Sequence, residues 1–146
     1  VTGVQTCALP IWIILTIVML LIPKTRKSGV IMAAALIVDV ILCNVILKNL
    51  IARVRPYDVN TAVQVLVAKP KDFSFPSGHT AASFASVTAL YLAGEKKLWK
   101  PALALAILIA FSRMYLYVHY PTDILGGVIF GSLSAWIGYQ CSKKYV

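Results

Sequence analysis

The chain has 146 residues, of which 60% are hydrophobic, and it carries a formal charge of +9. Its mean hydropathy of +0.82 excludes an ordinary water-soluble domain and indicates a membrane protein. In a soluble protein such a charge could indicate nucleic-acid binding. In a membrane protein it concerns orientation and an anionic substrate, so we expect no nucleic-acid partner.

Residues 1–11, VTGVQTCALPI, differ in character from the rest of the chain. They resemble the translation of a sequencing adaptor, so we expect them to be non-native and the domain to comprise residues 12–146. The apolar run that begins at Trp12 is shorter than the roughly 20 residues that span a bilayer. We interpret it as the end of a truncated transmembrane helix, because basic residues and no small-residue cleavage site follow it.

Four longer apolar segments follow, at about residues 30–47, 77–93, 98–115 and 121–141. Together with the run at Trp12 they predict an all-α polytopic transmembrane helix bundle of five helices at most. The connector at residues 57–75 has no helical periodicity and predicts a loop. Within it, residues 62–68 could form a short strand-like or interfacial piece.

These spans divide the basic residues between two ends of the bundle. One set is typical of cytoplasmic anchors; it comprises Lys24, Arg26, Lys27, Lys96, Lys97, Lys100, Lys143 and Lys144. The other set contradicts the positive-inside rule unless it has another task; it comprises Lys48, Arg53, Arg55, Lys69, Lys71 and Arg113. Both histidines fall at this second end. We therefore expect an anion site on the extracytoplasmic face and a cytoplasmic C-terminus.

The first motif, KNLIARVRP, separates Lys48 and Arg55 by six residues. A continuous helix would place these two cations on one face, roughly 10 Å apart along its axis. Pro56 disfavours helix at Arg55 and turns the chain outwards. The two cations could bind different oxygens of one phosphate or diphosphate. The alternative is a pair of interfacial anchors, and Arg53, about 160° from Arg55 on the helical wheel, is a candidate for that role.

The second motif, FPSGHT, has the features of a helix start. Pro76 suits the first turn, Ser77 can cap it, and Gly78 lets a bound group approach the backbone. Free N–H groups at a helix N-terminus favour an anion, and His79 in the first turn could donate a proton to a leaving oxygen. The alternative is a capped helix with an incidental histidine.

The third motif, SRMYLYVHYPTD, places Arg113 at the end of one helix and His119 just before the next. Asp123 lies in the first turn of that next helix, where it can face His119. An aspartate that accepts from one ring nitrogen raises the basicity of the other, so His119 is the better nucleophile and His79 the better acid. The alternative is that Asp123 caps a helix and His119 lies at an interface.

In this order the three motifs resemble the signature of the type 2 phosphatidic acid phosphatase (PAP2) family, written K-x6-RP, PSGH and SR-x5-H-x3-D, over residues 30–138. The resemblance implies a PAP2/haloperoxidase-type fold, of which this chain would hold about five of six helices. It implies that His119 forms a phosphohistidine, that Asp123 orients it, and that His79 protonates the departing oxygen. The phosphate-binding groups it implies are Lys48, Arg55, Ser77, Gly78 and Arg113. No metal or other cofactor is implied.

The same resemblance implies an integral membrane phosphatase that acts on a lipid phosphate or diphosphate in a bacterial cell membrane. We favour undecaprenyl diphosphate as the substrate. Phosphatidic acid, phosphatidylglycerol phosphate and diacylglycerol diphosphate stay open, as does the oligomeric state. A vanadium-dependent haloperoxidase is a rival interpretation, but those enzymes are soluble, and the predicted membrane spans of this chain argue against it. A noncatalytic lipid-phosphate binder or transporter subunit is another, but it would not need the pair of His119 and Asp123.

Two features within the spans have structural interpretations. Asp39 lies half a turn from Lys48 on the wheel and two to three turns below the expected site, so we favour an interhelical hydrogen bond or a protonated carboxyl there. Gly127, Gly131 and Ser134, spaced by four and three, predict a close helix-packing seam.

Overall fold

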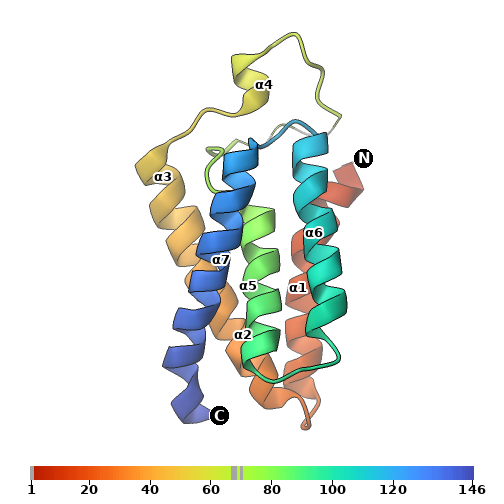
Figure 1. The fold of residues 1–146 in the computed structure, drawn as a ribbon, viewed down its shortest axis with the longest axis vertical. Helices are drawn as coiled ribbons and strands as arrows, with labels where there is room; N and C mark the ends of the chain where they lie inside the picture. The colour runs from red at the N-terminus through yellow and green to blue at the C-terminus, as the bar shows by residue number, and fades with distance from the viewer. Residues whose placement is uncertain (1, 67–68, 70) are drawn as a thin grey trace.

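The computed structural model describes residues 2–66, 69 and 71–146, with side chains from Leu9 onward in the first helix. Five long helical segments run up and down beside one another (Figure 1). They are α1 (Thr2–Leu21), the continuous run of α2 (Arg26–Asp39), η1 (Val40–Leu47) and α3 (Lys48–Ile51), then α5 (Gly78–Leu92), α6 (Trp99–Tyr115) and α7 (Pro121–Ser142). No strand occurs in these described residues. The predicted all-α bundle of five helices is confirmed.

The connector between α3 and α5 lies beyond one end of the bundle (Figure 1). Its described residues form one short helix, α4 (Pro56–Val59), and otherwise turns, bends and irregular backbone. Residues 62–66 form no strand, so of the two alternatives for residues 62–68 the strand-like one is wrong for them, and the interfacial one stays a prediction. Residues 67 and 68 lie outside the described part. A final turn, η2 (Lys143–Tyr145), follows α7 at the opposite end.

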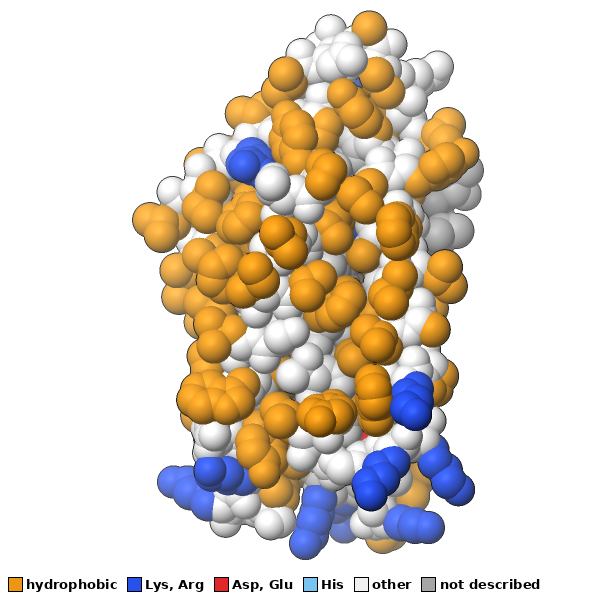
Figure 2. Space-filling view, viewed as in Figure 1, with side chains coloured by type: hydrophobic (Ala, Val, Ile, Leu, Met, Phe, Trp, Pro, Cys, Tyr) orange, Lys and Arg blue, Asp and Glu red, His pale blue; other side chains and the backbone are white. Residues whose placement is uncertain are grey.

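The exterior of the bundle is largely apolar. Figure 2 shows hydrophobic side chains over the length of the molecule and Lys and Arg side chains gathered at its lower end. Large apolar side chains on several helices face outwards, among them Leu50 (76% exposed), Leu108 (66%) and Phe111 (62%). Two helical stretches, Arg26–Val59 and Pro121–Tyr145, are long and apolar enough to cross a membrane. Such an exterior is favourable in lipid, because apolar side chains need no hydrogen-bond partners there and the backbone hydrogen bonds of a helix are internal.

Small residues bring α7 against its neighbours. A Cβ atom on Gly131 would lie 2.3 Å from the carbonyl oxygen of Ala81 in α5, and one on Gly138 would lie 2.6 Å from the backbone nitrogen of Ala35 in α2. Ser134 between them is fully buried. The predicted seam therefore exists, and Gly138 belongs to it. It fixes α7 on both α2 and α5, so the start of α7 lies beside the start of α5.

Candidate active site

The first motif folds differently from the helix that its spacing predicted. The helix ends at Ile51, because Ala52 takes up a left-handed backbone conformation with φ of 50°. Arg55 is extended, with ψ of 155°, immediately before Pro56. Lys48 and Arg55 therefore do not share a helix face, and that expectation was wrong. Both cations are nevertheless buried and turn to one point, since both form ion pairs with Asp72.

One cavity of about 130 Å³ collects side chains from all three motifs. Its lining includes Lys48, Arg55, Gly78, His79, Arg113 and His119. Three of these carry a full positive charge, and Arg113 is only 1% exposed. The other two predicted residues, Ser77 and Asp123, are neighbours of lining residues: Ser77 precedes Gly78, and Asp123 lies 3.4 Å from His119. The backbone N–H of Ser77 donates to the carbonyl oxygen of Asp123 at 3.1 Å. All eight predicted site residues thus lie together, and the cations favour an anion in the cavity.

The start of α5 forms one wall of this cavity. Ser77 is its N-cap, and its hydroxyl accepts a hydrogen bond from the backbone N–H of Thr80 at 3.4 Å. A Cβ atom on Gly78 would lie 3.3 Å from Oδ1 of Asn44 and 3.7 Å from Nζ of Lys48. The absence of a side chain at Gly78 keeps the helix start close to these polar groups. His79 follows within the first turn of the helix and lines the cavity.

His119 lies in the short connection between α6 and α7, with its two ring nitrogens facing different partners. Nε2 lies 3.2 Å from Nη1 of Arg55, which also donates to the carbonyl oxygen of Val118 at 2.9 Å. Nδ1 lies 3.4 Å from Oδ2 of Asp123, within ion-pair distance but without hydrogen-bonding geometry. Because Arg55 can only donate, we assign Nε2 as the unprotonated nitrogen and Nδ1 as the one that carries the proton.

The surroundings of His119 favour its neutral form. Burial lowers the pKa of His119, and the charges of Arg55 and Lys48 lower it further, while the nearby Asp123 carboxylate opposes them. The pKa of His119 therefore lies below its ordinary value of 6.5. A neutral imidazole with its lone pair on Nε2 is the form that can attack an electrophile.

Asp123 is fully buried and is held by three hydrogen-bond donors. It accepts hydrogen bonds from Nη1 of Arg53 at 2.8 Å, from the backbone N–H of Tyr120 at 2.8 Å, and from the hydroxyl of Ser74. These donors fix the carboxylate beside His119 and compensate its charge.

The role of Arg53 was missed at the level of sequence. The helical wheel turned it away from Arg55 and suggested an interfacial anchor, but that argument fails once the helix ends at Ile51. Its guanidinium group lies over the rings of Phe75 (5.5 Å) and Tyr120 (5.4 Å) while it binds Asp123. Arg53 therefore acts on the site through Asp123 and does not line the cavity.

A second missed residue is Asp72, in the connector before α5. One carboxylate oxygen pairs with Nζ of Lys48, and the other lies 2.6 Å from Nη2 of Arg55. The side chain is 53% exposed and lines the cavity. Partial burial alone would raise the pKa of Asp72, but the hydrogen bond and charge of Lys48, together with Arg55, hold it below its ordinary value. Asp72 is therefore an anion placed between two predicted phosphate-binding cations.

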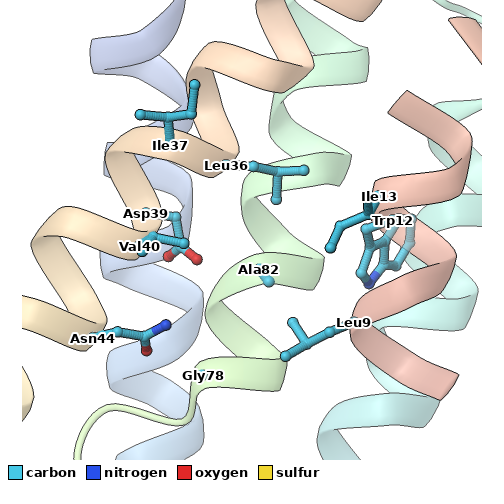
Figure 3. Close-up of a pocket in the computed structure, with 10 residues that line it drawn as sticks. All are labelled: Leu9, Trp12, Ile13, Leu36, Ile37, Asp39, Val40, Asn44, Gly78 and Ala82. Atoms are coloured by element: carbon cyan, nitrogen blue, oxygen red, sulfur yellow. The ribbon is translucent and has the colours of Figure 1, made fainter. Parts of the chain in front are cut away.

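An apolar pocket of about 350 Å³ adjoins the polar cavity between α1, the run of α2 and η1, and α5 (Figure 3). The two spaces share Leu9, Asn44 and Gly78 in their linings. Asp39 is the acidic exception in the apolar lining, and it is 2% exposed. Its Oδ1 has no hydrogen-bond partner within the described part of the chain, so the predicted interhelical bond is not found for that atom.

The chain belongs to the PAP2 superfamily, whose family model matches residues 28–146. The family resemblance that the three motifs indicate is thereby confirmed. This chain is 32% identical over 130 residues to an undecaprenyl-diphosphatase of Sulfolobus acidocaldarius, and the match covers 89% of this chain and 63% of that protein. It is 36% identical over 141 residues to phosphatidylglycerophosphatase B of Bacillus subtilis, covering 90% and 66%. The chain thus spans just under two thirds of the length of both relatives.

Two solved structures share the fold. The crystal structure of the transmembrane PAP2 type phosphatidylglycerolphosphate phosphatase from Bacillus subtilis matches with a TM-score of 0.71 and 32% identity, covering 98% of this chain and 75% of the other. That of Aquifex aeolicus LpxE matches with a TM-score of 0.76 and 25% identity, covering 95% and 85%. The predicted transmembrane bundle of the PAP2 type is confirmed.

Proposed function

We propose that this protein is an integral membrane phosphatase that removes phosphate from a lipid phosphate or diphosphate through a phosphohistidine. The observation that carries the proposal is one cavity that joins three cations to two histidines and opens beside an apolar pocket. The cavity suits the phosphate, and the pocket suits the first carbons of a lipid chain. The similarity to enzymes of lipid phosphates supports the same reading.

In the first step Nε2 of His119 attacks phosphorus and the bond to the leaving oxygen breaks. His79 gives that oxygen its proton, and Asp123 stabilises the imidazolium that forms on His119. Lys48, Arg55 and Arg113, with the amide of Gly78 at the start of α5, bind the phosphoryl oxygens. Because phosphoryl transfer depends mainly on positioning and charge compensation, these cations supply the main catalytic effect.

In the second step a water molecule attacks the phosphohistidine. His79, now neutral, takes a proton from that water, and the bond between phosphorus and Nε2 breaks. Inorganic phosphate leaves, and both histidines return to their starting states. The contact between Arg55 and Nε2 must yield during the reaction, since the nitrogen needs its lone pair for phosphorus.

For the substrate we favour undecaprenyl diphosphate, supported by the similarity to the Sulfolobus protein and to undecaprenyl-diphosphatase BcrC of Bacillus subtilis, which is 32% identical over 88 residues. Phosphatidylglycerol phosphate is the second candidate, supported by the 36% identity to phosphatidylglycerophosphatase B. We also propose that the site faces the extracytoplasmic side and the C-terminus the cytoplasm. The basic residues gathered at the other end of the bundle support this orientation (Figure 2).

The test is phosphate release from each candidate lipid by the purified protein in detergent micelles. Wild type should release phosphate, and His119→Ala should lose at least about 10³-fold in kcat. Tyr115→Ala is the matched control, because that side chain is 81% exposed at the end of α6 and should leave the rate unchanged. Binding of the lipids without any phosphate release would favour the noncatalytic lipid-binding alternative.

A further inference from the structure

Asp72 occupies the position in the cavity that an anionic ligand would take. Its two carboxylate oxygens divide between Lys48 and Arg55, as two oxygens of one phosphoryl group would. These are two of the three cations that line the cavity. A phosphoryl group cannot make the same two contacts while the carboxylate makes them.

The backbone around Asp72 is fixed independently of its carboxylate. Nε of Arg55 donates to the carbonyl oxygen of Asp72 at 3.0 Å, and the N–H of Ser74 donates to the carbonyl oxygen of Arg53 at 2.8 Å. The two cations are buried, at 6% and 3% exposure, whereas the Asp72 side chain is 53% exposed. The carboxylate can therefore turn out into solvent while the cations and the backbone stay in place.

We propose that Asp72 is an intramolecular competitor for the phosphate site, which substrate must displace on entry and which displaces inorganic phosphate on release. The proposal rests on the proposed function, in that the cavity is taken to bind phosphate. A competitor of this kind lowers the affinity of every anion that needs Lys48 and Arg55 by one common factor, the fraction of protein in which the carboxylate has left. That common factor distinguishes competition from a structural role of Asp72.

The test compares inorganic phosphate and vanadate as probes. Calorimetry on the purified protein gives the Kd for each anion without any need for turnover. Asp72→Asn removes the charge and should lower both Kd values by the same factor, about tenfold for a half-exposed carboxylate shared by two cations. Asp72→Glu keeps the charge and should stay near wild type. Asp58→Asn is the control, since Asp58 is an exposed acid in α4 that does not line the cavity.

Kd values that are unchanged or higher in Asp72→Asn would overturn the proposal, as would two different factors for the two anions. If Asp72→Asn does not fold, carbodiimide labelling of wild type decides the matter. Vanadate should displace the Asp72 carboxylate into solvent and so speed its labelling, while the labelling of Asp58 stays unchanged. An equal labelling rate at Asp72 with and without vanadate would refute the proposed displacement.

The two proposals fail separately. Loss of the Asp72 effect in a protein that still hydrolyses lipid phosphate would refute the competition alone. Tighter phosphate binding in Asp72→Asn, in a protein that hydrolyses none of the candidate lipids, would refute the phosphatase alone.

Discussion

Nη1 of Arg55 lies 3.2 Å from Nε2 of His119, so the guanidinium group proposed to bind the phosphate also faces the nitrogen proposed to attack it. This contact has two effects. It holds the ring with the Nε2 lone pair directed at Arg55, and it disfavours the protonated imidazole by placing a second positive charge beside it. The proposed nucleophile is thus kept unprotonated by a group that is also proposed to bind the substrate.

The first prediction concerns pH. Protonation of His119 abolishes the nucleophile, so kcat/KM should fall on the acid side at the pKa of His119. Because that pKa is lowered by burial and by Arg55, the acid limb should lie below the ordinary value of 6.5. The Asp123 carboxylate raises the pKa, so Asp123→Asn should move the limb to still lower pH while kcat falls about 10²- to 10⁴-fold.

The measurement is the pH profile of kcat/KM for wild type and Asp123→Asn on one lipid substrate, with unfolding followed at each pH. A limb that moves to higher pH in Asp123→Asn would contradict the assignment of His119 to it.

The second prediction concerns Arg53. Removal of its hydrogen bond leaves the buried Asp123 carboxylate with fewer donors, so Arg53→Ala should lower kcat roughly 10- to 100-fold. The Ki for inorganic phosphate should not change, because Arg53 does not line the cavity. Arg53→Lys should recover part of the rate, and Arg26→Ala, an exposed residue at the other end of the bundle, serves as the control. A Ki that rises with the loss of kcat would instead make Arg53 a phosphate ligand.

The third prediction compares two glycines. In Gly78→Ala the new Cβ would meet Oδ1 of Asn44 at 3.3 Å and approach Nζ of Lys48, so the Ki for phosphate should rise several-fold with little change in stability. In Gly94→Ala the Cβ meets nothing within 4 Å, but φ is +83°, so stability should fall by about 1 kcal/mol and the Ki should not change. Phosphate inhibition and thermal unfolding of both variants provide the test, and the reverse pattern would refute it.

The fourth prediction concerns the seam on α7. In Gly131→Ala the Cβ would lie 2.3 Å from the backbone of Ala81, which cannot move without separating α5 from α7. We expect the free energy of unfolding to fall by about 1–3 kcal/mol. The control is Ile129→Ala, because Ile129 is 54% exposed on the same helix. Equal unfolding midpoints of the two variants in a denaturing-detergent titration would contradict the seam.

The long apolar helices could be predicted from sequence because each is a run of apolar residues bounded by Pro, Gly or basic residues. α6 and α7 begin and end within one residue of the predicted spans 98–115 and 121–141. The end of α3 could not be predicted, because Ala52 is an unusual residue for a left-handed conformation and carries no local signal. For that reason the prediction that Lys48 and Arg55 share one helix face was wrong.

The motif residues could be placed in one site because each motif lies where a helix begins or ends, at the same end of the bundle. Asp72 and Arg53 could not, since their contacts depend on tertiary structure: Asp72 lies 24 and 17 residues from its partners, and Arg53 lies 70 residues from Asp123. An acid in a loop without periodicity gives no sign of the cations that it will meet.

The bond between Arg53 and Asp123 also has a consequence for biosynthesis. The chain emerges from its N-terminus, so Arg53 and Ser74 leave the ribosome well before the carboxylate that both will bind. Until the start of α7 is made, His119 lacks the Asp123 carboxylate and Arg53 lacks this partner. We therefore expect the proposed site to be complete only after α7 has docked against α5.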